Sequence, residues 1–164
     1  MQVPTLGKKQ GRKNRFRSGG PDVGRLTGCY DRVTGMKKVT LRPHHILCER
    51  FLNVEFPERG REFQQVEQRV RDVTQGGDET LVEVAQGIDE LCRVCPHCRD
   101  DRCQHPQGDE EAVRKWDNII VTGLGVSYGE TKTSKEWGIL VREKAPLKFC
   151  LTRCPSKSRC TISP

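Results

Sequence analysis

Cysteine thiols carry the strongest chemical signal in this sequence. Nine of its 164 residues are cysteines, and four of them lie in the segment from Cys92 to Cys103. The CxxC step from Cys92 to Cys95 lets two sulfurs face one metal ion or neighbouring corners of a cluster. An odd number of cysteines excludes complete disulfide pairing within the chain, and reduced cysteines at short spacings are typical of metal ligands. The sequence therefore predicts a metal–thiolate centre.

A second group of cysteines lies near the end of the sequence, at Cys150, Cys154 and Cys160. We expect this segment to dock across the Cys92–Cys103 loop, so that metal binding closes the domain and contributes to its folding. Cys48 is a further candidate ligand, and a buried core thiol is the alternative at that position. Arginines flank both groups, and their charge would offset that of a thiolate site: Arg93, Arg99, Arg102, Arg153 and Arg159.

The number of thiols favours an iron–sulfur cluster, because a 4Fe–4S cluster takes about four cysteines. Zinc is the alternative cofactor, since CxxC steps bind it equally well, and the protein would then be a structural zinc-binding adaptor module. His44 and His45 precede Cys48 by about one helical turn. Either histidine could donate a proton beside an open metal position, which would make the protein a metal-dependent enzyme. Alternatively, both could support the ligands through hydrogen bonds.

The elements that must position these side chains are mostly helical. Pro43 suits the first position of a helix that would carry both histidines. Apolar residues at steps of three and four predict a second helix. Acidic residues after Asp109 favour the start of a third helix. Thr133 and Glu136 have the spacing of a capping box, which predicts the start of a fourth. The expected helices span residues 43–52, 57–73, 109–124 and 133–146.

Two segments between the helices are expected to differ from them. Leu81–Val84 is a short β-prone run, and Cys92–Cys103 contains too many turn-forming residues for a regular element, so that metal would have to order it. The fold class we predict is therefore mostly α, an α+β fold with at most a short strand. It would be a small single domain of about four helices with a cysteine-rich loop and a cysteine-rich C-terminus.

Charge separates the chain into two regions. Residues 1–35 carry eight Lys and Arg against two Asp, a net +6 of the total +7, which leaves +1 for residues 36–164. We expect residues 1–35 to be a disordered basic extension and residues 36–164 to form the cysteine-rich domain. A nearly neutral domain lacks the footprint of a nucleic-acid-binding protein, so nucleic acid would bind only weakly, through the extension.

The cellular setting follows from the N-terminal segment and the thiols. Residues 1–35 contain no apolar run suited to a signal peptide or a membrane span. We therefore expect a cytoplasmic protein with reduced cysteines and no membrane association. A redox protein is the one kind of partner that a cluster would suggest.

Several motifs resemble one known family. Leu41-Arg-Pro-His-His-Ile-Leu-Cys48 is similar to the opening box of a bacterial and archaeal family known as domain of unknown function 1284, and Ile88–Pro96 with Cys103 resembles its DDICxxCP segment. The similarity continues through Val113–Asp117, Leu124-Gly125, Gly129 and the terminal cysteines, and covers most of residues 36–160. The terminal group departs from the family pattern, which has CxxC followed by a tryptophan.

The resemblance has consequences for the cofactor and its ligands. Members of this family are regarded as iron–sulfur proteins, and none has an established reaction. The ligands that the resemblance implies are Cys48, Cys92, Cys95, Cys103, Cys150, Cys154 and Cys160. Cys98 has no counterpart in the family pattern and is expected to be an additional thiol of this chain.

Overall fold

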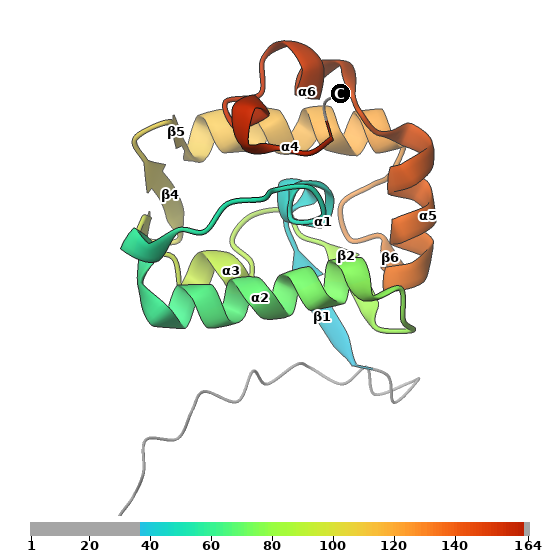
Figure 1. The fold of residues 1–164 in the computed structure, drawn as a ribbon, viewed down its shortest axis with the longest axis horizontal. Coiled ribbons are helices and arrows are strands. Elements are labelled where there is room, and N and C mark those ends of the chain that lie inside the picture. Colours follow the sequence, from blue (N-terminus) through green and yellow to red (C-terminus); the bar gives the residue numbers. More distant parts are fainter. Residues whose placement is uncertain (1–36, 163–164) are drawn as a thin grey trace, which may run out of the picture.

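Helices and short strands alternate along the chain (Figure 1). The computed structural model describes residues 37–162, so the extension predicted at residues 1–35 lies outside the described residues. The α-helices of this part are α1 (Pro43–Cys48), α2 (Gly60–Gly76), α3 (Glu90–Arg93), α4 (Glu110–Leu124), α5 (Ser134–Lys144) and α6 (Lys148–Thr152). The strands are β1 (Lys38–Leu41), β2 (Leu81–Val84), β3 (Cys98–Arg99), β4 (Arg102–His105), β5 (Gly108–Asp109) and β6 (Thr131–Thr133), and two 3₁₀ turns are η1 (Pro57–Arg59) and η2 (Lys157–Arg159).

Three strands from distant parts of the chain form a mixed sheet in the order β1-β2-β6. β1 runs parallel to β2 with Val39 opposite Val82, and β6 runs antiparallel to β2. The strand predicted at residues 81–84 is confirmed as β2. The prediction of at most one short strand was wrong. β1 and β6 are too short to show a periodicity of their own in the sequence, and they form by pairing with β2.

The helices pack around one apolar core. α1 lies at the centre of the domain, between α2 and α4 (Figure 1). Trp137 of α5 is fully buried, and its Nε1 donates a hydrogen bond to the Val82 carbonyl of the sheet at 2.9 Å. The mostly helical α+β class is confirmed, with six α-helices within residues 37–162 in place of the four expected. None of these helices is long and apolar enough to cross a membrane.

Local signals located most of the helix starts, whereas α1 ends at Cys48 and not at residue 52 as expected. The side chain of Asp109 caps α4 by accepting from the Ala112 N–H at 3.0 Å. The predicted capping box is present at α5, where Thr133 and Glu136 exchange hydrogen bonds. α2 begins at Gly60 rather than at residue 57, because residues 57–59 form the 3₁₀ turn η1. α6 was not predicted.

The segment from Cys92 to Cys103, expected to be an irregular loop, contains α3, β3 and β4. β3 and β4 form a hairpin whose turn residues Asp100 and Asp101 both have positive φ, 51° and 54°. Two such residues in succession give the turn that suits the twist of a two-residue hairpin, and Asp tolerates this conformation better than most residues. β5 then pairs with β4 to complete a second three-stranded sheet.

Candidate metal centre

Four cysteines from opposite ends of the domain line one cavity. Cys48 ends α1, Cys150 lies within α6, and Cys154 and Cys160 follow in the C-terminal segment. The remaining lining is largely apolar: Leu47, Phe51, Leu52, Ser156, Lys157 and Ile162. The structure thus brings together Cys48 and the whole C-terminal cysteine group.

Backbone hydrogen bonds hold this group of four thiols in place. Leu52 and Cys160 form an isolated antiparallel bridge. Beside it, the Thr161 N–H donates to the Phe51 carbonyl at 2.9 Å and the Asn53 N–H donates to the Arg159 carbonyl at 3.2 Å. The C-terminal segment therefore docks on the residues that follow α1, and not across the Cys92–Cys103 segment as expected.

The spacing of the four sulfurs bears on what they could hold. Within residues 37–162, the one group of three ligand atoms that all lie within 4.8 Å of one another is elsewhere, at His45, Asp89 and Cys92. Thiolates around one zinc ion lie about 3.8 Å apart, given Zn–S bonds of about 2.3 Å. The cavity sulfurs are thus spread more widely than a bound zinc ion requires. The cavity itself is about 20 Å³, room for about one water, so a cluster requires the C-terminal segment to move outward.

In the absence of metal, the surroundings of Cys48, Cys150 and Cys154 favour the protonated thiol by raising its pKa. Burial raises the pKa of Cys48 well above its usual value, and the neighbouring thiols of Cys154, Cys150 and Cys160 raise it further. Burial is also the largest cause of the raised pKa values of Cys150 and Cys154. Lys157 is the one cationic residue of the lining. A cationic metal core would supply the positive charge that stabilises four thiolates here.

Three other cysteines, Cys95, Cys98 and Cys103, lie together on the β3–β4 hairpin and the turn before it. Cys98 is paired directly with Cys103 across the two strands, and the Cys98 N–H donates to the Cys95 carbonyl at 2.9 Å. None of the three lines the four-thiol cavity. The thiols that the resemblance grouped into one ligand set are therefore separated in space.

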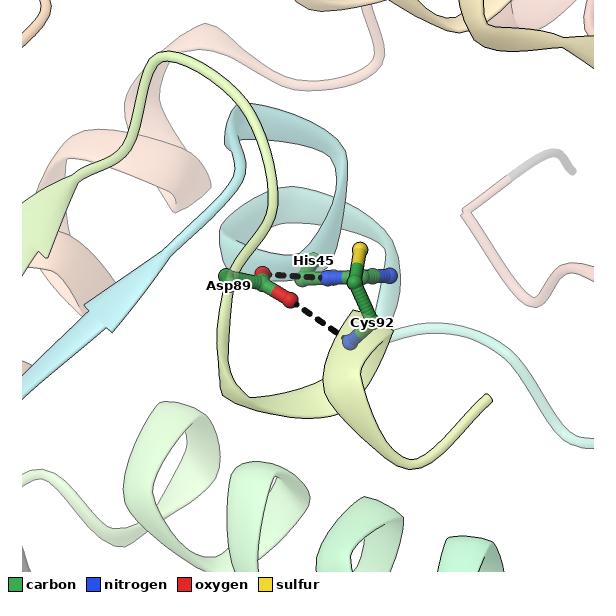
Figure 2. A group of neighbouring side chains, drawn as sticks. All are labelled: His45, Asp89 and Cys92. Carbon is green, nitrogen blue, oxygen red and sulfur yellow. Dashed lines mark hydrogen bonds and ion pairs between the residues drawn. The ribbon is translucent and has the colours of Figure 1, made fainter. Parts of the chain in front are cut away.

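Cys92 lies apart from both groups, beside His45 and Asp89 (Figure 2). Asp89 caps α3 by accepting the Cys92 N–H at 2.9 Å, and its other oxygen accepts the Arg42 N–H and faces His45 Nδ1 at 2.6 Å. Burial and the Asp89 carboxylate raise the pKa of the Cys92 thiol. His45, Asp89 and Cys92 are thus the one group within residues 37–162 whose ligand atoms already lie within 4.8 Å of one another, although both Asp89 oxygens already accept hydrogen bonds.

The two histidines have different protonation tendencies. Burial alone would lower the pKa of His45, but the carboxylates of Asp89, Glu49 and Asp117 together raise it, with Asp89 contributing most. In return, His45 and the backbone N–H groups hold the pKa of Asp89 below its usual range despite burial. The pKa of His44 is lowered by burial and by the charge of His45, although its Nδ1 lies 2.7 Å from Asp117. The pair thus favours a charged His45 and a neutral His44.

Arg42 connects the histidine region to the hairpin. Its fully buried guanidinium donates to Asp117 at 2.8 Å and to Glu110 at 3.2 Å. Glu110 also accepts the Cys103 N–H at 2.9 Å. The network therefore ties α1, α4 and β4 together, and it orients the helix that carries Cys48.

The acidic members of this network were not predicted as site residues. Asp89 and Asp117 fall inside the segments that resemble the family, and Arg42 precedes the histidines. Charged residues among apolar neighbours are the one signal that could have indicated them, since charges are buried only when they are paired.

Comparisons with known proteins bear on the family alone. Residues 60–160 match the model of a family described as "Protein of unknown function (DUF1284)". Searches of curated proteins and of solved structures give no match to the chain.

Proposed function

Since the chain belongs to the DUF1284 family, whose description names no activity, we propose a function from the site itself: the protein binds one 4Fe–4S cluster through Cys48, Cys150, Cys154 and Cys160. The cluster would serve a cytoplasmic redox, sensing or sulfur-related role. The observation that carries this proposal is the convergence of four thiols on one largely apolar cavity.

The number and the surroundings of the thiols fit this cofactor. A 4Fe–4S cluster takes about four cysteine ligands, and the cavity supplies that number from two separate stretches of the chain. Backbone amides near the sulfurs support thiolate, as at Cys154, where hydrogen bonding by the Ser156 backbone opposes the rise in pKa due to burial.

The two histidines would support the cluster rather than react. Each ring is held through Nδ1 by a buried carboxylate, His44 by Asp117 and His45 by Asp89. These contacts fix the orientation of α1, which ends at Cys48. We therefore assign the histidines a positioning role.

Anaerobic purification followed by iron, sulfide and zinc analysis tests the proposal. About four iron and four sulfide per chain are expected in the wild-type protein. Cys154→Ser should lose most of this iron, because serine does not replace a soft thiolate ligand. Cys98→Ser is the matched control, since Cys98 lies outside the cavity. A colourless wild-type protein that retains zinc and takes up no cluster on reconstitution would contradict the proposal.

A further inference from the structure

The hairpin cysteines form a second set of ligands that the proposed cluster does not use. Cys98 and Cys103 are directly opposite one another in the antiparallel β3–β4 pair, so their side chains lie on the same face of the hairpin. Along β4 the half-buried residues are Cys103 and His105, while Arg102 and Gln104 are exposed. Because alternate residues of a strand share a face, Cys98, Cys103 and His105 are on one side.

Cys95 joins this face through a tight turn. Cys95-Pro96-His97-Cys98 is a CxxC step closed by the hydrogen bond from the Cys98 N–H to the Cys95 carbonyl. Burial raises the pKa of Cys95, but hydrogen bonding by the backbone of His97 opposes that rise, and so does that of Cys98. Backbone amides directed at the first sulfur of a CxxC step are a feature of metal–thiolate sites, where they stabilise the anionic ligand.

A cation already lies beside this face. The Arg59 guanidinium stacks on Phe56 and Phe63, at 4.1 and 4.8 Å from the ring centres. Its Nε is buried without a hydrogen-bond partner among the described residues, and its charge acts on both Cys95 and His105. Three thiolates around a divalent ion leave one net negative charge, which Arg59 would offset.

From this arrangement we propose that Cys95, Cys98 and Cys103 bind a zinc ion, with His105 as the fourth ligand. Three thiolates and one imidazole are a common structural zinc set, and the four residues have a C-x2-C-x4-C-x-H spacing. The site would be separate from the cluster, and it depends on Cys98, the thiol that the family resemblance does not include. Its role would be to hold the hairpin closed against α4.

The side chains must still move to bind the ion. No three of these ligand atoms lie within 4.8 Å of one another in the structure, so rotation about the Cα–Cβ bonds has to bring the sulfurs inward. The Nδ1 of His105 accepts a hydrogen bond from the Gln107 N–H at 3.1 Å. Nε2 is therefore the ring atom that would bind the metal, in place of its proton.

Zinc analysis of three proteins separates this site from the cluster. The wild-type protein and Cys154→Ser, which lacks a cavity ligand, should both hold about one zinc per chain after gel filtration. Cys98→Ser should hold less than a tenth of that zinc while its iron is unchanged. Circular dichroism checks that each variant is folded. Cobalt(II) added in place of zinc to metal-free Cys154→Ser, whose cavity ligand set is incomplete, should give thiolate charge-transfer bands that are lost when Cys98→Ser is added to that variant.

The fourth ligand has its own test. His105→Ala should weaken zinc binding at least tenfold in a competition with a chelator, whereas His97→Ala should not, although the two rings lie in contact with centroids 4.6 Å apart. Equal zinc in Cys98→Ser and wild type, or zinc lost from Cys154→Ser and retained in Cys98→Ser, would overturn the site. Loss of iron alone would leave it standing, so failure of the cluster proposal and failure of this one give different results.

Discussion

Leu52 and Cys160 form an antiparallel bridge that fastens the C-terminal segment to the end of α1. The bridge puts the last cysteine of the chain on the cavity that also contains Cys48. Besides the hydrogen bonds of Thr161 and Asn53, few hydrogen bonds among the described residues join the C-terminal segment to the rest of the domain. Ordering of the segment and binding of metal by the cavity are therefore coupled, as in other sites whose ligands come from distant parts of a chain.

The first prediction concerns this coupling. In metal-free protein, amide hydrogen exchange in residues 150–162 should be faster than in cluster-loaded protein, because without metal no ligand bonds join the C-terminal cysteines to Cys48. Cys160→Ser should show the fast exchange even under reconstitution conditions, and α2 should be protected equally in all samples. Full protection of residues 150–162 without metal would mean that the fold is complete before the cofactor binds.

The second prediction concerns the buried ion network. Asp117→Asn leaves the Arg42 guanidinium without one of its two carboxylate partners in a site where both side chains are nearly inaccessible. We expect a loss of about 3 kcal/mol in the free energy of unfolding, measured by urea denaturation. Glu111→Gln is the control, because its ion pair with Lys115 is exposed and screened by solvent and should contribute little to stability.

A third prediction follows from the His45–Asp89 pair. The pKa of His45 is raised above 6.5, so its contribution to stability is complete below that pH and is lost as pH rises through the folded value. The pKa of Asp89 is lowered, so its contribution to stability is present above pH 3.8 and is lost as pH falls through the folded value. The pair should therefore stabilise the fold most between these two values.

Urea denaturation over a range of pH checks this window. Wild-type stability should fall above about pH 6.5, and His45→Gln should remove most of that fall. His44→Gln should leave the fall in place, because the pKa of His44 is shifted downward and contributes with the opposite sign. An identical pH profile for wild type and His45→Gln would show that the pair does not titrate as the geometry implies.

The fourth prediction concerns the hairpin. A Cβ at Gly108 would overlap the Trp116 ring of α4, and Gly108 of β5 pairs with His105 of β4, the proposed fourth zinc ligand. Gly108→Ala should destabilise the domain by about 1–3 kcal/mol through overpacking, and should weaken zinc binding at the hairpin. Gly76→Ala, where a Cβ meets nothing within 4 Å at the end of α2, should be neutral or slightly stabilising. Thermal unfolding and zinc competition measure both effects.

Much of the domain could be predicted because its signals are local. Thr133 and Glu136 are three residues apart, and Asp109 caps the helix that directly follows it, so these helix starts depend on neighbouring residues alone. The position of Pro43 at the start of α1 is of the same kind. The sequence by itself also predicted a metal–thiolate centre, since residue type and spacing are all that this inference needs.

The tertiary structure decided which thiols act together. Cys92 and Cys95 are neighbours in a CxxC step, yet Cys92 lies in the cap of α3 with Asp89 while Cys95 faces the hairpin. Cys48 joins the C-terminal cysteines only because the Leu52–Cys160 bridge forms between residues far apart in the chain. Pairing of that kind depends on the packing of the whole domain and leaves no periodicity in the sequence. The burial of Arg42 and its pairing with two carboxylates could not be predicted for the same reason, because they too depend on the packing of the whole domain.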